Sequence, residues 1–221
     1  MAVSIKPNHS CKRSEQFFNL FWLFFIASFL GVVIESLWCI LTRGMYESRS
    51  GLIYGPFNLI YGFGAVIMTL CLHPIRYKSD QVIFFGGFLI GSIFEYICSY
   101  VQQQWFGTVS WDYSHFWFNL DGRINLLYSC FWGLLAIAWI RWFSPKILSW
   151  IQLIPHSCRH CLTWLLVCFM VFNTVISAVA LNRQTERREC IPANNAFELL
   201  IDQLYPDERL AQIYPNMIYV E

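Results

Sequence analysis

Five long apolar runs constrain this chain more than any other feature of its sequence. They cover residues 17–41, 53–72, 81–101, 124–143 and 161–181. Each run reaches the roughly 20 residues that an α-helix needs to cross a hydrocarbon core of about 30 Å. Backbone amides must be paired inside lipid, so the alternatives are helices or a closed barrel. The apolar residues are continuous rather than alternating, which favours helices.

Composition agrees with an all-α, polytopic membrane protein of five transmembrane helices. The 221 residues are 57% hydrophobic and only 13% charged, whereas soluble domains carry about 25% charged residues. A net charge of +1 gives no field that would attract nucleic acid. We therefore divide the chain into an amino-terminal segment 1–16, a transmembrane domain 17–181 and a polar tail 182–221. The expected partner is the lipid bilayer and not nucleic acid.

The basic residues predict an orientation in the cell membrane. The first run is too long for a signal peptide and contains Glu35, so we keep it as a span. The loops on the amino-terminal side of the membrane hold Lys6, Lys12, Arg13, Arg76, Lys78, Arg141, Lys146 and Arg159. The opposite loops hold Arg43, Arg49 and Arg123. This bias predicts a cytoplasmic amino terminus, although counting the arginines of the tail nearly removes it.

Two parts of the chain resemble each other. The first span contains GVVIE and the third contains GSIFE, which end in Glu35 and Glu95. The spans that follow begin with FNLIY and INLLY, which contain Asn58 and Asn125. This similarity predicts that spans one and two and spans three and four form a parallel hairpin repeat, related by an axis along the membrane normal. Chance similarity between apolar segments is the alternative.

Polar residues of the repeat are expected in one layer of the outer leaflet. Glu35 and Glu95 each lie about 9 Å below the outer end of a span, at a rise of about 1.5 Å per residue. Asn58 is predicted at a similar depth. An ionised carboxylate inside a span costs about 3 kcal/mol, so it should pair with a cation or bind a proton. The cations predicted on this side are Arg43, Arg49 and Arg123. The alternative is that these ion pairs only lock the bundle.

The loop WDYSHFWFNLDGRI, residues 111–124, combines five aromatic residues of the Phe, Trp and Tyr types with two aspartates and an arginine. An aromatic belt at the membrane interface explains its tryptophans. It does not explain Asp112, Asp121 or Arg123. Asp-Gly is a turn signal, and Asp112 precedes residues suited to an Asx turn or a helix cap. We expect a compact loop that covers the polar layer as a lid.

Four segments carry a resemblance to a known family. SGLIYGPFNLIYGFG, GSIFEYICSY, WDYS and FNLDGRINLLYSCFWGLL together resemble the CmpB-like family of small bacterial membrane proteins, which are described as type IV ABC-transporter permeases. The resemblance covers roughly residues 17–143. It implies a permease subunit driven by a separate ATPase. The chain itself has no G-x-x-x-x-G-K-[ST] motif for binding ATP.

The resemblance and the polar layer together select the candidate residues. The chain departs from the family pattern at Asn58 and Asn125, where the family often has cysteine, so the carboxylates and Arg123 are the better candidates. We expect no metal, no cofactor and no catalytic residue of a recognised constellation. The candidates for substrate binding or proton coupling are Glu35, Glu95, Arg123, Arg49, Asp112, Asp121, Asn58, Asn125 and Tyr54.

Three other segments allow limited predictions. HSCRHC, residues 156–161, could ligate zinc, but it lacks a second ligand pair at finger spacing, so a polar loop is the preferred interpretation. Residues 144–155 form a cytoplasmic loop that is either an ATPase-docking surface or, the favoured interpretation, an interfacial amphipathic helix. In the tail, Asn195 and Glu198 predict a capped helix at residues 196–204.

Three functions compete on this evidence. We prefer a transporter subunit with a polar site in the outer half of the bundle. The alternative is a membrane-embedded enzyme that acts on a lipid headgroup or a lipid-linked substrate with paired carboxylates. The third is a scaffold without chemistry. Five small spans also make a homodimer a reasonable expectation.

Overall fold

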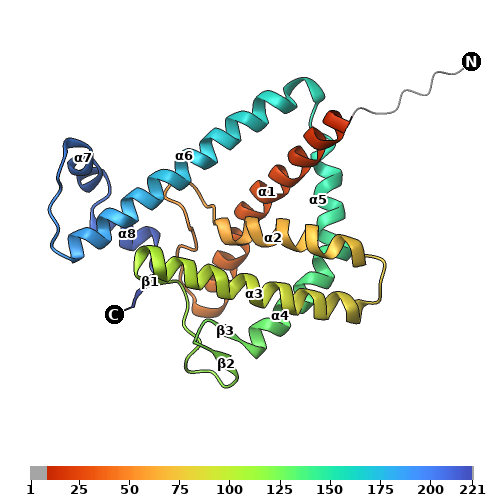
Figure 1. The fold of residues 1–221 in the computed structure, drawn as a ribbon, viewed down its shortest axis with the longest axis horizontal. Coiled ribbons are helices and arrows are strands. Elements are labelled where there is room, and N and C mark those ends of the chain that lie inside the picture. Colours follow the sequence, from red (N-terminus) through yellow and green to blue (C-terminus); the bar gives the residue numbers. More distant parts are fainter. Residues whose placement is uncertain (1–8, 221) are drawn as a thin grey trace, which may run out of the picture.

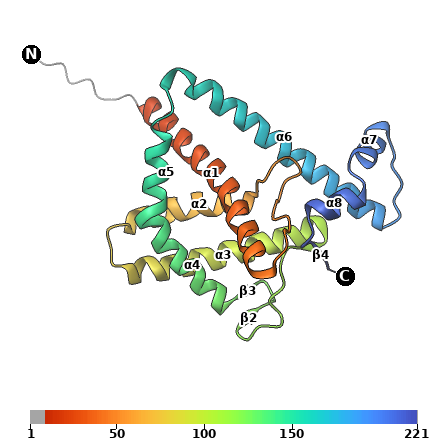
Figure 2. The same cartoon turned by 180° about the vertical axis from the view of Figure 1, so that it is seen from behind.

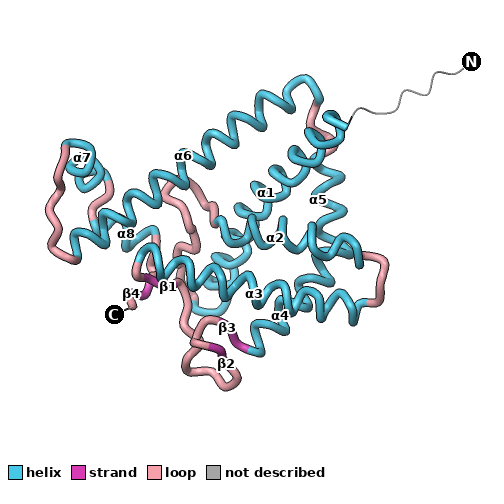
Figure 3. The backbone as a smooth tube through the Cα atoms, viewed as in Figure 1, coloured by secondary structure: helices cyan, strands magenta, loops and turns pink. Residues whose placement is uncertain are grey.

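The computed structural model describes residues 9–220, which form a helical protein with four very short strands (Figure 1; Figure 3). The helices are α1 (His9–Arg43), α2 (Leu59–Leu72), α3 (Asp80–Phe106), α4 (Leu126–Ala138), α5 (Ser144–Ile151), α6 (His156–Arg188), α7 (Ala196–Leu204) and α8 (Asp207–Ile213). The strands are β1 (Thr108–Val109), β2 (Asn119–Leu120), β3 (Ile124–Asn125) and β4 (Ile218–Tyr219).

Four helices in the described part of the chain are long and apolar enough to cross a membrane. They are Glu15–Arg43, Asp80–Phe106, Leu126–Ile151 and Ser157–Arg188. In Figure 1, α1, α3 and α6 begin toward the right and end toward the left or bottom, where the β2–β3 hairpin also lies. We call this second end the hairpin side. The mostly helical fold with several candidate membrane spans is thereby confirmed, while the fifth span and the hairpin repeat stay predictions.

The second predicted span is interrupted. Residues 53–58 were expected to be helical, but the helix begins only at Leu59 and has 14 residues, a length of about 21 Å. The backbone N–H of Asn58 donates to the carbonyl of Ser28 at 3.1 Å. Ser28 is fully buried and lies near the midpoint of the crossing Glu15–Arg43. The helix α2 therefore begins beside the middle of α1.

The irregular segment before α2 has its backbone groups satisfied by α6. The N–H of Ile53 donates to Ser177 Oγ at 3.0 Å, and the N–H of Tyr54 donates to Asn173 Oδ1 at 3.0 Å. Asn173 Nδ2 donates back to the carbonyl of Tyr54 at 2.7 Å. Irregular backbone at membrane depth is tolerated only where it is paired inside protein. Gly55, with φ of 79°, holds the chain out of a helix here.

Close packing joins α3 to α4 at two glycines of α3, Gly87 and Gly91. A Cβ atom on Gly91 would lie 2.3 Å from the ring of Trp132, and one on Gly87 would lie 2.1 Å from the Cβ of Ala136. Both distances are too short for a side chain at either position. The G-x-x-x-G segment, residues 87–91, is therefore a packing surface between these two helices.

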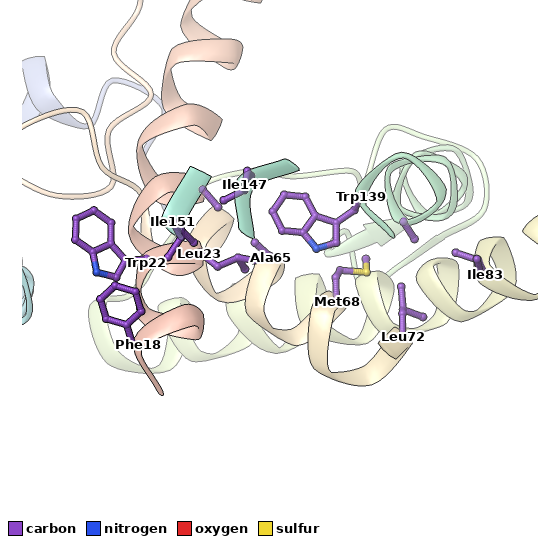
Figure 4. Packing of buried hydrophobic residues seen from close by; sticks show 12 residues of the cluster. Phe18, Trp22, Leu23, Ala65, Met68, Leu72, Ile83, Trp139, Ile147 and Ile151 are labelled. Carbon is purple, nitrogen blue, oxygen red and sulfur yellow. The ribbon is translucent and has the colours of Figure 1, made fainter. Parts of the chain in front are cut away.

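Residues 126–151 form one continuous rod, so the helix favoured for the segment 144–155 is present over Ser144–Ile151 but continues α4. A π-helical turn, Trp139–Phe143, connects α4 to α5. It lies just before Pro145, whose missing N–H removes one donor from the helical ladder. Ile147 and Ile151 are buried. Figure 4 shows them with the rings of Phe18 and Trp22 in the main core cluster.

The tail folds back onto the hairpin side. Strand β4 pairs antiparallel with β1, directly after α3. A second apolar cluster contains Ala180 of α6, Ile201 of α7, Tyr205 and Leu210 of α8. Figure 2 shows α8 near the end of α3, with α7 beside the end of α6. The predicted helix 196–204 and its cap are confirmed, because the N–H of Glu198 donates to Asn195 Oδ1 at 2.9 Å.

Candidate functional site

Glu95 is the most deeply buried carboxylate of the spans, with 7% of its surface exposed. The hydroxyl of Tyr113 donates to Glu95 Oε1 at 2.9 Å, and Trp132 Nε1 donates to Oε2 at 2.9 Å. Among the lysines and arginines whose side chains the structure describes, from residue 15 onward, none forms an ion pair with it. A carboxylate in such a place is costly unless it is neutralised or paired. Glu95 is therefore held by neutral donors and still lacks a cation.

The loop that precedes the β2–β3 hairpin carries Tyr113 to this carboxylate. The N–H of Tyr113 donates to the carbonyl of Gly122, in the turn of the hairpin, at 2.7 Å. Asp112 forms the expected Asx turn, because its carboxylate accepts from the N–H and the hydroxyl of Ser114 at 2.8 and 2.9 Å. These hydrogen bonds hold the pKa of Asp112 below its usual value. Trp111 Nε1 donates to the carbonyl of Arg123 at 2.9 Å and closes the hairpin. The compact loop predicted as a lid thus places one of its side chains on Glu95.

Tyr113 also packs on α4 and keeps its hydroxyl protonated. Its ring stacks on Tyr128 of α4 with centroids 4.6 Å apart. Burial, and then the carboxylates of Glu95 and Glu35, raise the pKa of Tyr113 well above its ordinary value. The hydroxyl consequently stays protonated, as its donation to Glu95 requires.

Glu35 lies in a second polar cluster, on α1. Arg49 Nη1 is 3.5 Å from Glu35 Oε1, and Arg49 Nη2 is 2.7 Å from Glu47 Oε2. The same guanidinium approaches Cys39 Sγ at 2.8 and 3.2 Å. Arg43 pairs with Glu47 at 2.8 Å instead of with a glutamate of the spans. The expected ion pair therefore exists at Glu35 through Arg49 alone.

Arg123 does not pair with Glu35 or Glu95, which corrects the expectation that it would be a cation partner of these carboxylates. Its Nη1 donates to Ser99 Oγ at 3.0 Å, and its Nη2 donates to Gln103. Its guanidinium lies 5.7 Å from the ring of Tyr96 and 5.6 Å from that of Tyr100. These four residues line one face near the end of α3. Arg123 thus fixes the hairpin to α3 and adds no charge at Glu95.

The two asparagines of the repeat make matching contacts. Asn58 Oδ1 accepts from the N–H of Ile60 at 3.0 Å, and Asn125 Oδ1 accepts from the N–H of Leu127 at 2.7 Å. Each amide nitrogen donates to a carbonyl of the preceding loop at 3.3 Å, which belongs to Arg49 or Trp117. Both residues are therefore N-caps.

Their depths differ from the prediction of a common layer. Asn58 is bonded to Ser28, which precedes Glu35 by seven residues and lies about 10 Å deeper along α1. Asn125 starts α4 near the end of α3. The remaining candidates have structural partners: Asp121 Oδ2 accepts from the Tyr96 hydroxyl at 2.8 Å. The hydroxyl of Tyr54 lies 2.7 Å from that of Tyr205 in the tail.

Sequence reasoning missed three residues that shape these sites. Trp132 binds Glu95, while Asn173 and Ser177 hold the irregular segment before α2. The sequence could have identified Asn173, because it is a polar residue in the middle of the apolar run 161–181. The HSCRHC segment forms the first turns of α6, where Cys158 and Cys161 are exposed.

A family model decides the relationship of the chain to known proteins. The model described as "Putative ABC-transporter type IV" matches residues 22–178. The chain belongs to this family. Within the type IV ABC-transporter family, the matched region contains both glutamates, the β2–β3 hairpin and Asn173 and Ser177 of α6. No curated protein and no solved structure matches the chain.

Proposed function

We propose that the chain is the membrane-spanning permease subunit of a transporter, and that its solute site lies between the interrupted second crossing and Glu95. The observation that carries the proposal is the start of α2 beside the middle of α1. Transporters build substrate sites from discontinuous helices, whose half-helix ends and unwound backbone lie near the middle of the bilayer. The family relationship supports the same role, with a separate ATPase as the energy source.

Glu95 supplies the charge that such a site needs. Its carboxylate is buried and bonded only to neutral donors within the described chain. A cation or a proton that reaches the site would therefore pair with this carboxylate. The Tyr113 hydroxyl must leave Glu95 Oε1 before a solute can replace it. The β2–β3 hairpin therefore acts as the gate on its side of the membrane.

The chain also fits a place in a larger assembly. The distribution of basic residues supports a cytoplasmic amino terminus in a bacterial membrane. The hairpin side then faces outward. The ATPase and a second copy of the chain would be the partners of this subunit.

Cys98 provides a test that does not require the solute to be known. It lies one turn after Glu95 on α3 and is half-buried. Membrane-impermeant thiol reagents are applied to intact cells and to inverted vesicles supplied with ATP, and peptide mass spectrometry measures modification of Cys98. A transporter predicts modification from both sides, each under its own condition. Cys158, exposed in the first turn of α6, and Cys190, exposed beyond its last turn, lie at opposite ends of this helix and monitor reagent access that does not depend on the site.

Modification from the hairpin side alone, under every condition, would contradict transport and favour the enzyme interpretation. The variant Glu95→Gln separates a site from a scaffold. A site predicts normal abundance in the membrane with loss of the ATP-dependent modification. Lower abundance without any other change would instead assign Glu95 a purely structural role.

A further inference from the structure

Helix α7 in the tail turns its apolar face outward. Its exposed positions are Ala196, Phe197, Leu199, Leu200, Gln203 and Leu204. Four of these are large apolar side chains with 46–56% of their surface exposed. Its two charged residues, Glu198 and Asp202, lie on the half-buried side. This is the reverse of a helix that covers a core in water, where charged residues face the solvent.

The charges of α7 are neutralised inside the protein. Arg183 of α6 has 2% of its surface exposed. Its Nη2 lies 2.7 Å from Asp202 Oδ2, and its Nη1 lies 3.7 Å from Glu198 Oε2. Arg187 also pairs with Asp202. Both carboxylates of α7 thus bind arginines of α6, so the outward face of the helix carries no charge.

The depth of α7 places that face beside lipid. Ile201 and Tyr205 pack in one cluster with Ile176, Val179 and Ala180. These α6 residues belong to the last turns of the apolar run 161–181, which crosses the membrane. A helix packed against them lies at the level of the lipid interface and not in bulk water. Amphipathic helices lie in this plane with their apolar face in the acyl boundary.

A groove of about 600 Å³ runs between the end of α3, α6 and α7. Its apolar walls include Trp105, Phe106, Val179 and Phe197, and Asn182 and Glu186 supply polar groups. Trp105 and Phe197 are 73% and 56% exposed, and aromatic residues favour the membrane interface. The groove therefore joins an apolar channel to a polar end at the depth where a phospholipid has its glycerol and headgroup.

We propose that α7 lies in the lipid interface on the hairpin side, and that its groove with α3 and α6 binds one phospholipid. The acyl chain lies along Phe106, Val179 and Phe197, and the positively charged amine of a zwitterionic headgroup meets Glu186 beside Asn182. The apolar face of α7 continues the lipid-facing surface of α6, where Phe172 and Val175 are exposed. This continuity selects lipid as the occupant. The proposal does not depend on transport.

A groove-filling variant tests the lipid site. Ala178 lines the groove on α6 and is half-buried, so Ala178→Phe fills the space that the chain of a lipid would occupy. Ala196→Phe adds the same ring on the exposed face of α7, outside the groove. Full-length proteins are purified from membranes and examined by native mass spectrometry. We expect the mass of one phospholipid on the wild type and on Ala196→Phe, and its loss from Ala178→Phe.

Photo-crosslinking tests the outward face separately. A benzophenone amino acid is placed at Leu200 or, as control, at Glu208, an exposed residue of α8. Illumination in native membranes should add the mass of a phospholipid at Leu200 and much less at Glu208. A cross-linked dimer from Leu200 would assign the face to a second copy of the chain and overturn the proposal. Equal lipid retention by Ala178→Phe, or no retained lipid on the wild type, would overturn the groove site.

Discussion

At the scale of single residues, the hydroxyl of Tyr113 decides how the hairpin engages the spans. It is bonded to Glu95 across the boundary between a loop and a transmembrane helix. We predict that Tyr113→Phe lowers the free energy of unfolding by about 1.5–3 kcal/mol, the usual value of a hydrogen bond to a charged group. The same change should increase modification of Cys98 from the hairpin side. Thermal unfolding in nanodiscs and thiol labelling measure the two effects.

The control for this change is Tyr46→Phe. Tyr46 is 69% exposed, so removal of its hydroxyl should leave both measurements at the wild-type values. If Tyr113→Phe unfolds like the wild type and Cys98 stays protected, the hairpin is not the gate of the Glu95 site.

Asn125 offers a second test at this scale, because it caps α4 and also holds the hairpin. Asn125→Ala should cost about 1 kcal/mol through loss of the N-cap. Asn125→Ser keeps a neutral acceptor for the N–H of Leu127 and loses the bond to the carbonyl of Trp117, so it should cost less. Chemical denaturation in detergent compares the variants. An equal loss for both would show that the bond to the loop matters more than the cap.

The sequence identified the important carboxylates but not their partners. Glu35 and Glu95 could be found because a charge inside an apolar run is rare and costly. The direction of Arg123 could not be found, since it follows from the backbone of the hairpin. There Phe118 and Asp121 adopt positive φ angles of 58° and 52°. Those angles turn Arg123 toward Ser99 and Gln103 and leave Tyr113 to meet Glu95.

At the scale of secondary-structure elements, α3 and α4 depend on two glycines. Gly91→Ala places a methyl group against the Trp132 ring, which also donates to Glu95. We predict a loss of about 1–3 kcal/mol, as for other overpacked interfaces. Gly86→Ala, on the same helix, meets only the ends of the Leu72 and Ile75 side chains, which can move aside. Unfolding titrations should therefore find Gly86→Ala close to the wild type, and equal losses would contradict this packing.

The ends of the elements were harder to predict than their existence. The apolar runs located four crossings because their length alone is decisive. Residues 53–58 are equally apolar, yet they remain irregular because Asn173 and Ser177, more than 110 residues away, pair with their backbone. Residues 144–151 were favoured as a separate interfacial helix after a break near Pro145. They continue the preceding helix because Ile147 and Ile151 gain burial in the core.

At the scale of the whole molecule, charge pairs fasten the tail to the membrane domain. Hydrogen bonds from Arg183 and Arg187 hold the pKa of Asp202 below its ordinary value of 3.8. A carboxylate with a lowered pKa stabilises the folded state above its ordinary pKa, and this contribution is lost as the pH falls through the folded value. We predict that α7 loosens below about pH 3.8.

Hydrogen exchange of the α7 amides, corrected for intrinsic rates, measures this release. The variant Asp202→Asn should exchange faster than the wild type at neutral pH and change less on acidification. Protection of α7 that is the same in both proteins at every pH would show that the apolar contacts of Ile201 and Tyr205 hold the tail without the ion pairs.

The π-helical turn at Trp139–Phe143 lets the continuous rod 126–151 pack against two different helices. A π turn holds one residue more than an α turn, so it rotates everything after it by about 100° around the helix axis. The first half of the rod packs against α3, and the second half brings Ile147 and Ile151 onto α1. Deleting a single residue here would restore an even helical phase and swing that second half away from its partner. The position therefore tolerates exchange of side chains far better than a change in chain length.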